Sequence, residues 1–566
     1  MAQFALLATH RDIVGREPQV SELRSILAKY QRREVIFLLA KLNAVLGTWT
    51  NEPNFDLDDQ ISRLFLKRHL NQLAELKRQG QARVVFSRMT LLYLVKQACV
   101  ASGETGALVN TDDAVADIGL AALMANDLML PFLPSNRDGT LQRLANLFPF
   151  ADYISTDGYA TEVARGQKMF ELASQLASLR ERHDFVDISR RFEELFGLPY
   201  PIFCQLIFGC ATKFLDIQMK NLQSPNALVL KETFFQRSTV SLERARKFFE
   251  MFAISDADLA EKIKASASRP GDDFTILQGS PLLLLAPDLY TCFDPGFLVD
   301  KAGRSLYWTL FSALNDNERT KLGSFWGAVF EKYVNQLLAQ SYAAGGTFFP
   351  APKFPNGDEA FDGYIHERGS LIVFEHKSST LRADAKYGGD PGKLKKDLDR
   401  KFIEGDEDGA KGIAQLNKSL VRFLRGEPIG ELTPEDVHTI YPCMVCLDNA
   451  VSVPYMAAYF KEQFKAVFPR KGVRQTVTNL FTLNITDVEK LLGYLGRFQL
   501  SDIFESYHSN NRTMLTSLSS SEVPLLKGVD PEPTVLRQGF SDFAKKLEED
   551  LFPHEAAQQS AAPHAV

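Results

Sequence analysis

Two apolar runs in the second half of the chain carry charged side chains of the kinds that bind metals and move protons. Asp362 lies in the run Phe361–His366, and Glu375 and Lys377 end the run Leu371–Lys377. Side chains alternate between the faces of a strand, so Glu375 and Lys377 share one face. The short loop between the runs suits a hairpin, which brings Asp362 close to both. We therefore expect two carboxylates and an ammonium group to converge at the end of an apolar strand.

These three side chains fit metal-dependent hydrolysis of a phosphodiester bond. Burying two carboxylates is costly unless a cation organises them. Mg²⁺ or Mn²⁺ binds a few carboxylate oxygens, and Mg²⁺ keeps several waters that a phosphate can replace. Such a metal lowers the pKa of a bound water and stabilises charge on the phosphate oxygens. Lys377 would position or activate the attacking water and add positive charge.

The arrangement resembles the PD-(D/E)xK nuclease superfamily over roughly residues 320–500, on Asp362 followed by Glu375-His376-Lys377. Two further features match: a preceding helix with Glu331 and a following helix with Gln415. The sequence departs from the family name in having Phe361, not proline, before the aspartate.

The resemblance implies a restriction-endonuclease-like fold, in which a central mixed sheet is flanked by helices. It also implies the roles of the residues. Asp362, Glu375 and the backbone carbonyl of His376 would bind Mg²⁺ or Mn²⁺. Lys377 would be the catalytic lysine, Gln415 would orient water or substrate, and Glu331 would be an additional acidic member.

The helix around Gln415 also carries a basic stripe. Lys411, Gln415, Lys418 and Arg422 fall on one face at helical spacing. This face is a candidate for holding a nucleic-acid backbone beside the metal. A solvated helix face is the equally simple interpretation.

The segment between Thr380 and Lys411 is rich in both acidic and basic residues. Its lysines and arginines are of the type that contacts phosphate, but nearby aspartates and glutamates cancel their charge. We interpret it as a mobile flap over the site, with an ordinary surface helix as the alternative.

The composition of the whole chain is that of a globular protein. The chain has 566 residues, of which 45% are hydrophobic and 24% charged, and a net charge of −6. An acidic total does not suggest nucleic-acid binding, which would have to depend on a local patch. Six scattered cysteines exclude a disulfide-stapled secreted domain, and no signal peptide or apolar run of membrane-spanning length is evident. We therefore expect a soluble, cytoplasmic protein with no membrane association.

The length predicts two or three domains. Helical periodicity dominates the first half, whereas strand-like runs alternate with helices after residue 345, which indicates an α/β core. We expect five parts: a mostly helical region for recognition or regulation (1–265), a connecting segment with short strands at Phe274–Leu277 and Leu282–Leu285 (266–320), a nuclease-like domain (321–500), a C-terminal helical extension (501–550) and a disordered tail (551–566).

The predicted function is a metal-dependent endonuclease that cleaves DNA. The resemblance makes restriction, repair or antiviral defence against foreign DNA the expected setting. One site cuts one strand, so double-strand cleavage would need a homodimer or a partner protein. The alternatives are an inactive nuclease fold that binds nucleic acid or a protein partner, and a nuclease that acts on RNA.

Overall fold

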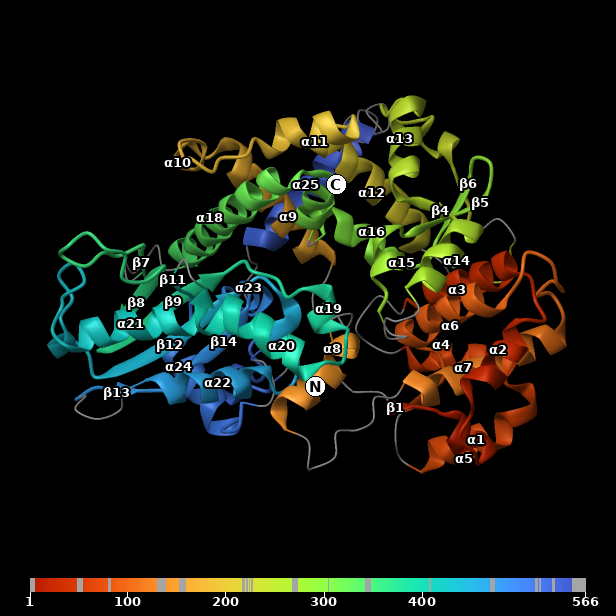
Figure 1. Ribbon diagram of the computed structural model, residues 1–566, viewed down its shortest axis with the longest axis horizontal. Coiled ribbons are helices and arrows are strands. Elements are labelled where there is room, and N and C mark those ends of the chain that lie inside the picture. The colour runs from red at the N-terminus through yellow and green to blue at the C-terminus, as the bar shows by residue number, and fades with distance from the viewer. Residues whose placement is uncertain are drawn as a thin grey trace, which may run out of the picture.

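A computed structural model describes most of the chain and shows a mixed α/β protein with a helical N-terminal region (Figure 1). The described residues are 6–47, 54–79, 83–129, 139–151, 159–215, 219, 222, 224, 228–266, 273–303, 305–341, 348–406, 409–468, 474–514, 518, 521–531 and 535–551. The predicted disordered tail therefore lies outside the described residues, apart from its first residue, Leu551.

The N-terminal lobe, red and orange in Figure 1, is a bundle of helices around an apolar core. Its helices start at polar caps: the Ser87 hydroxyl accepts a hydrogen bond from Thr90 N, and the Asn54 side chain accepts one from Leu57 N. The helices are α1 (His10–Val14), α2 (Val20–Leu27), α3 (Arg32–Leu46), α4 (Phe55–Phe65), α5 (Leu70–Arg78), α6 (Arg88–Ala101) and α7 (Asp112–Met129), joined in the same core by α14 (Asp256–Ala265) and α15 (Thr275–Gly279).

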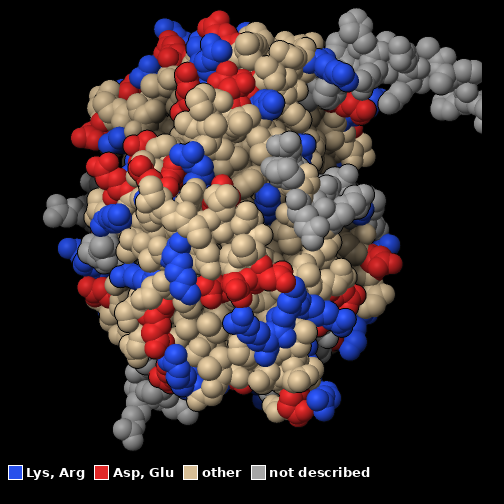
Figure 2. All heavy atoms as spheres, turned by 90° about the vertical axis from the view of Figure 1, so that its right-hand side faces the viewer, with Lys and Arg blue, Asp and Glu red and all other residues tan. Residues whose placement is uncertain are grey.

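The outer face of this lobe mixes charges of both signs. Figure 2 shows Lys and Arg interspersed with Asp and Glu over the side that faces right in Figure 1. Ion pairs such as Lys67–Asp112 and Lys29–Asp117, at 2.8 and 2.7 Å, explain part of this mixture. This face therefore carries no electrostatic sign of nucleic-acid binding.

A second layer of helices crosses the top of Figure 1 and packs against a small four-stranded sheet. The sheet order is β3 (Leu230–Lys231), β6 (Leu289–Cys292), β5 (Leu282–Ala286) and β4 (Ala253–Ser255). The helices are α9 (Tyr159–Gln175), α10 (Ala177–Arg180), α11 (Ile188–Phe196), α12 (Tyr200–Leu215), α13 (Leu242–Phe252), α16 (Pro295–Val299), α17 (Leu306–Ala313) and α25 (Val535–Leu551).

The larger sheet, at the lower left of Figure 1, has six strands and mixed direction. β7 (Phe348–Pro350), β8 (Gly363–Glu367) and β9 (Ser370–Lys377) pair antiparallel in succession. β12 (Thr439–Cys446) then runs parallel to β9, and it pairs in parallel with both β13 (Thr476–Val477) and β14 (Phe481–Asn484). The hairpin β8–β9 and the parallel crossover to β12 make β9 a central strand.

Helices cover both faces of this sheet because its strands are apolar on both sides. Ile372 and Phe374 of β9 share a core with α18 (Asp316–Ser341), α23 (Ile485–Leu491) and α24 (Leu500–Asn510). Leu371 and Val373 share the opposite core with α20 (Pro391–Leu398), α21 (Ile413–Leu424) and α22 (Met456–Val467). Continuous apolar runs are what a sheet buried on both faces requires.

Two helices of the predicted N-terminal region belong to cores of the C-terminal half. Leu144, Ala145 and Phe148 of α8 (Thr140–Ala151) lie in the core formed with α20, α21 and α22. Arg165 of α9 donates from Nε to Glu489 Oε1 at 2.7 Å, and both side chains are buried. Tyr333 of α18 donates to the same Glu489 oxygen at 2.7 Å. The two halves of the chain are therefore joined through buried contacts.

The structure corrects several local expectations. Leu282–Leu285 is a strand, as predicted, but Phe274–Leu277 begins helix α15, because a short buried apolar run suits either structure. Helices α17 and α18 are separate helices, and Asn315 Oδ1 between them accepts a hydrogen bond from Glu318 N. The charged segment 380–411 contains a surface helix, α20, as the alternative interpretation expected, and is not an open flap: Lys393, Lys395 and Lys396 are exposed, whereas Leu394, Leu398 and Phe402 are buried in the core.

No single helix within the described ranges is long and apolar enough to cross a membrane. The bent pair Ile188–Phe196 and Tyr200–Phe214, with 63° between its helices, passes the same test of length and composition.

We predict that Arg165→Ala destabilises the whole fold, because it leaves the Glu489 carboxylate buried without its charged partner. The expected cost is about 3–5 kcal/mol, measured by chemical denaturation. The matched control is Arg165→Met with Glu489→Leu, which removes both charges and should cost clearly less. Equal losses for the single and double variants would contradict this account.

Candidate functional site

The hairpin β8–β9 brings Asp362 opposite Glu375, as the sequence predicts. Asp362 N donates to Phe374 O at 3.1 Å, which continues the ladder in which Gly363 faces Phe374. Asp362 Oδ2 accepts a hydrogen bond from His376 N. Both carboxylates are deeply buried, with exposed fractions of 9% for Asp362 and 1% for Glu375.

Lys377 compensates this buried negative charge. Its Nζ lies 2.5 Å from Glu375 Oε1 and 3.4 Å from Gln415 Oε1 on α21. Burial acts to lower the pKa of Lys377, but the carboxylates of Glu375 and Asp362 outweigh burial and raise that pKa. The lysine is therefore a charged ammonium group held between a carboxylate and an amide. This contact also brings Gln415 to the site.

The His376 side chain does not join the site, because it points to the opposite face of the sheet. The ring is buried between Phe330 and Phe374, at centroid distances of 6.4 and 6.1 Å. Neither ring nitrogen has a hydrogen-bond partner, and burial lowers the pKa of His376 to about 3. A neutral core histidine follows, so only its backbone remains available to the site.

A cluster of three acidic residues forms beside this pair. Carboxylate oxygens of Glu331 on α18, Glu359 and Asp362 all lie within 4.8 Å of one another. Burial, followed by repulsion from Asp362 and Glu359, raises the pKa of Glu331 to about 7. Partial desolvation and Asp362 likewise raise the pKa of Glu359. Burial and the neighbouring carboxylates therefore both disfavour the charged forms of Glu331 and Glu359.

Glu359 is the one member of this cluster that the sequence analysis missed. It lies in an exposed loop, outside any strand or helix pattern, three positions before Asp362. Its position so close to Asp362 was the only signal in the sequence. Glu331, expected as an additional acidic member, does approach Asp362. Glu375 instead pairs with Lys377.

The predicted basic stripe is only partly presented to solvent. Lys418 is exposed, whereas Lys411 precedes the start of α21 at Ile413. Arg422 forms ion pairs with Asp358 and Glu427 at 2.8 and 2.7 Å. It also stacks over the Phe354 ring at 4.0 Å. Two carboxylates therefore neutralise Arg422, which reduces its use as a phosphate ligand.

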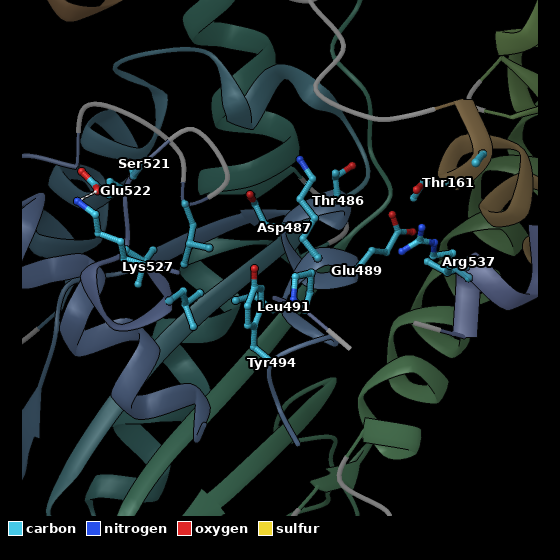
Figure 3. A pocket seen from close by; sticks show the side chains of 17 residues that line it. Thr161, Thr486, Asp487, Glu489, Leu491, Tyr494, Ser521, Glu522, Lys527 and Arg537 are labelled. Carbon is cyan, nitrogen blue, oxygen red and sulfur yellow. Dashed lines mark ion pairs between the residues drawn. The ribbon is translucent and has the colours of Figure 1, made fainter. Parts of the chain in front are cut away.

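A cavity of about 670 Å³ lies outside this site (Figure 3). Its walls come from α23, the segment 521–531 and the first turns of α9 and α25. Lys527 pairs with Glu522 on one side, while Glu489 and Arg537 lie on the other. Because acidic and basic groups balance, the cavity has no clear preference for a charged ligand. None of its lining residues belongs to the predicted site.

We compared the chain with models of protein families, with curated proteins and with solved structures, and none of the three comparisons found a match.

We predict that Glu331 makes the metal-free protein less stable as pH rises. Its folded pKa of about 7 exceeds the ordinary 4.5, so the folded state retains a proton that the unfolded state releases. Stability should therefore fall between pH 4.5 and 7, by on the order of 2 kcal/mol from this group. In EDTA, Glu331→Gln should reduce the loss of melting temperature between pH 5 and 8. Glu431→Gln, at an exposed glutamate outside the cluster, is the control, and an unchanged pH dependence in Glu331→Gln would refute the assignment.

Proposed function

We propose that this protein is a metal-dependent endonuclease that hydrolyses phosphodiester bonds of DNA, through a C-terminal domain of the PD-(D/E)xK, restriction-endonuclease-like kind. The observation that carries the proposal is the convergence of Asp362, Glu375 and Lys377 at the end of β9. Three charged groups in an otherwise apolar core are costly, so their presence favours a catalytic role.

The surrounding elements support the same proposal. Helix α18 covers one face of the sheet and supplies Glu331, while α21 covers the other and supplies Gln415. A strand hairpin, a crossover and a parallel strand place these groups around one end of β9. The resemblance of the sequence to the PD-(D/E)xK superfamily implies a mixed sheet flanked by helices of this kind.

The acidic cluster fits a divalent cation. Glu331, Glu359 and Asp362 offer hard oxygen ligands in one small volume, and their raised pKa values show mutual repulsion that a cation would relieve. Glu375 and the His376 carbonyl are the further ligands that the resemblance implies. When bound, Mg²⁺ or Mn²⁺ would lower the pKa of a water and neutralise phosphate charge.

Side chains of the protein would stabilise the charge that develops on the phosphate and hold the attacking water. Lys377, as an ammonium group, stabilises negative charge that develops on the phosphate and holds the water that attacks it. Glu375 orients that ammonium group through the 2.5 Å contact. Gln415 accepts from Lys377 through Oε1, so its amide nitrogen can donate to water or to a phosphate oxygen.

We expect plasmid cleavage that requires Mg²⁺ or Mn²⁺ and falls by about 100-fold or more in Glu375→Gln and Lys377→Met. Lys262→Met removes an exposed charge on α14, outside the site and the basic stripe, and serves as the matched control. Single-stranded DNA, duplex DNA and RNA should be compared as substrates. Full activity in Lys377→Met would exclude the proposed site, and cleavage of RNA alone would change the substrate.

We also expect calorimetry to detect Mn²⁺ binding that Asp362→Asn abolishes. Glu359→Gln should weaken binding by about tenfold or more, because it removes one charged ligand. Glu427→Gln, an acidic residue outside the cluster, is the control. Binding that is unchanged in Asp362→Asn would mean that the metal lies elsewhere. Metal binding with no cleavage of any substrate would favour the inactive binding module.

A further inference from the structure

An exposed aromatic ring lies on the same face of the sheet as the candidate site. Phe349 of β7 is 43% exposed, a large fraction for an apolar side chain within a strand. It pairs across the ladder with Tyr364, and the two rings stack at a centroid distance of 4.6 Å and an angle of 17°. The ring is therefore held in a fixed orientation by a partner that is itself only 6% exposed.

The register of strands β7, β8 and β9 shows where the Phe349 ring lies relative to the carboxylates of Asp362 and Glu375. Tyr364 faces Val373, and the same ladder places Asp362 opposite Glu375. Residues two apart on a strand share a face, so Phe349, Tyr364 and Asp362 all lie on the face of Glu375 and Lys377. Two residues along a strand span roughly 7 Å, which is about two stacked nucleotides of 3.4 Å each.

The Phe349 ring stacks on Tyr364 and is otherwise partly exposed. β7 is the last strand at its edge of the described sheet (Figure 1). The acidic cluster has basic neighbours, since Lys332 and Lys353 lie near enough to Glu359 to oppose the rise in its pKa. A partly exposed aromatic ring on the face of the site suits binding to a single strand, because every base has a face that can stack.

We propose that Phe349 stacks on an unpaired base of the substrate and so gives the enzyme a preference for single-stranded or locally opened DNA. This inference rests on the proposed nuclease function and refines its substrate class. Paired bases in a duplex stack on their neighbours and do not present a free face, so an intact duplex would not use Phe349.

The test measures binding of the full chain to a fluorescent dT20 strand and to a blunt 20-base-pair duplex, in EDTA so that no cutting occurs. Phe349→Leu keeps apolar bulk but removes the aromatic face, and it should weaken dT20 binding roughly 5- to 150-fold, the effect of losing one stacked base. Phe349→Trp should restore binding, and duplex binding should not change in either variant. Phe234→Ala, at another exposed aromatic residue (42%), is the control.

Three results would overturn the inference. If the wild type binds dT20 and cuts DNA but Phe349→Leu binds equally well, stacking at Phe349 is excluded while the nuclease proposal stands. If Phe349→Leu leaves binding unchanged but reduces self-association in size-exclusion chromatography, the ring belongs to a protein interface. If the wild type neither binds nor cuts any nucleic acid, both the inference and the proposed function fail. Melting temperatures of the variants would confirm that each remains folded.

Discussion

The buried ion pair between Glu375 and Lys377 on the central strand β9 constrains how the rest of the sheet must be covered. A carboxylate that is 1% exposed costs several kcal/mol to bury unless an opposite charge and hydrogen bonds compensate it. Lys377 supplies the charge, and Gln415 on α21 holds Lys377 in place. Helices must cover both faces of the sheet so that water does not reach this ion pair. A surface strand with the same residues would show ordinary solvated charges.

The sequence could predict the features that depend on short-range periodicity. Alternation along β9 separated Glu375 and Lys377 from His376, and the structure has the histidine ring in the opposite core. The hairpin loop correctly indicated that Asp362 faces Glu375. The helical stripe around Gln415 also formed a helix, α21. In each case the period of the apolar residues determines which side chains share a face.

The features that sequence could not reveal depend on contacts between distant segments. Glu359 joins the acidic cluster from a loop, where no periodicity indicates which way a side chain points. Phe148 of α8 enters the core beside α20, and no local pattern pairs two segments so far apart in the chain. The charge-rich segment 380–411 is anchored to the core at particular points, where Lys386 pairs with Asp448 and Lys401 with Asp397, at 2.8 and 3.0 Å. Composition alone could not show which of its charged side chains find buried partners.

The contact between Arg165 and Glu489 also constrains how the chain folds during synthesis. The two residues are 324 positions apart, and ribosomes add about 5–20 residues per second. Arg165 therefore waits for roughly 15–65 s before its partner leaves the ribosome. During that interval the apolar side of α9 has no completed core, which makes the nascent chain a natural client for chaperones. The sheet that holds the site is complete only after β14 (Phe481–Asn484) has been made, so a product that ends before β14 would lack part of that sheet.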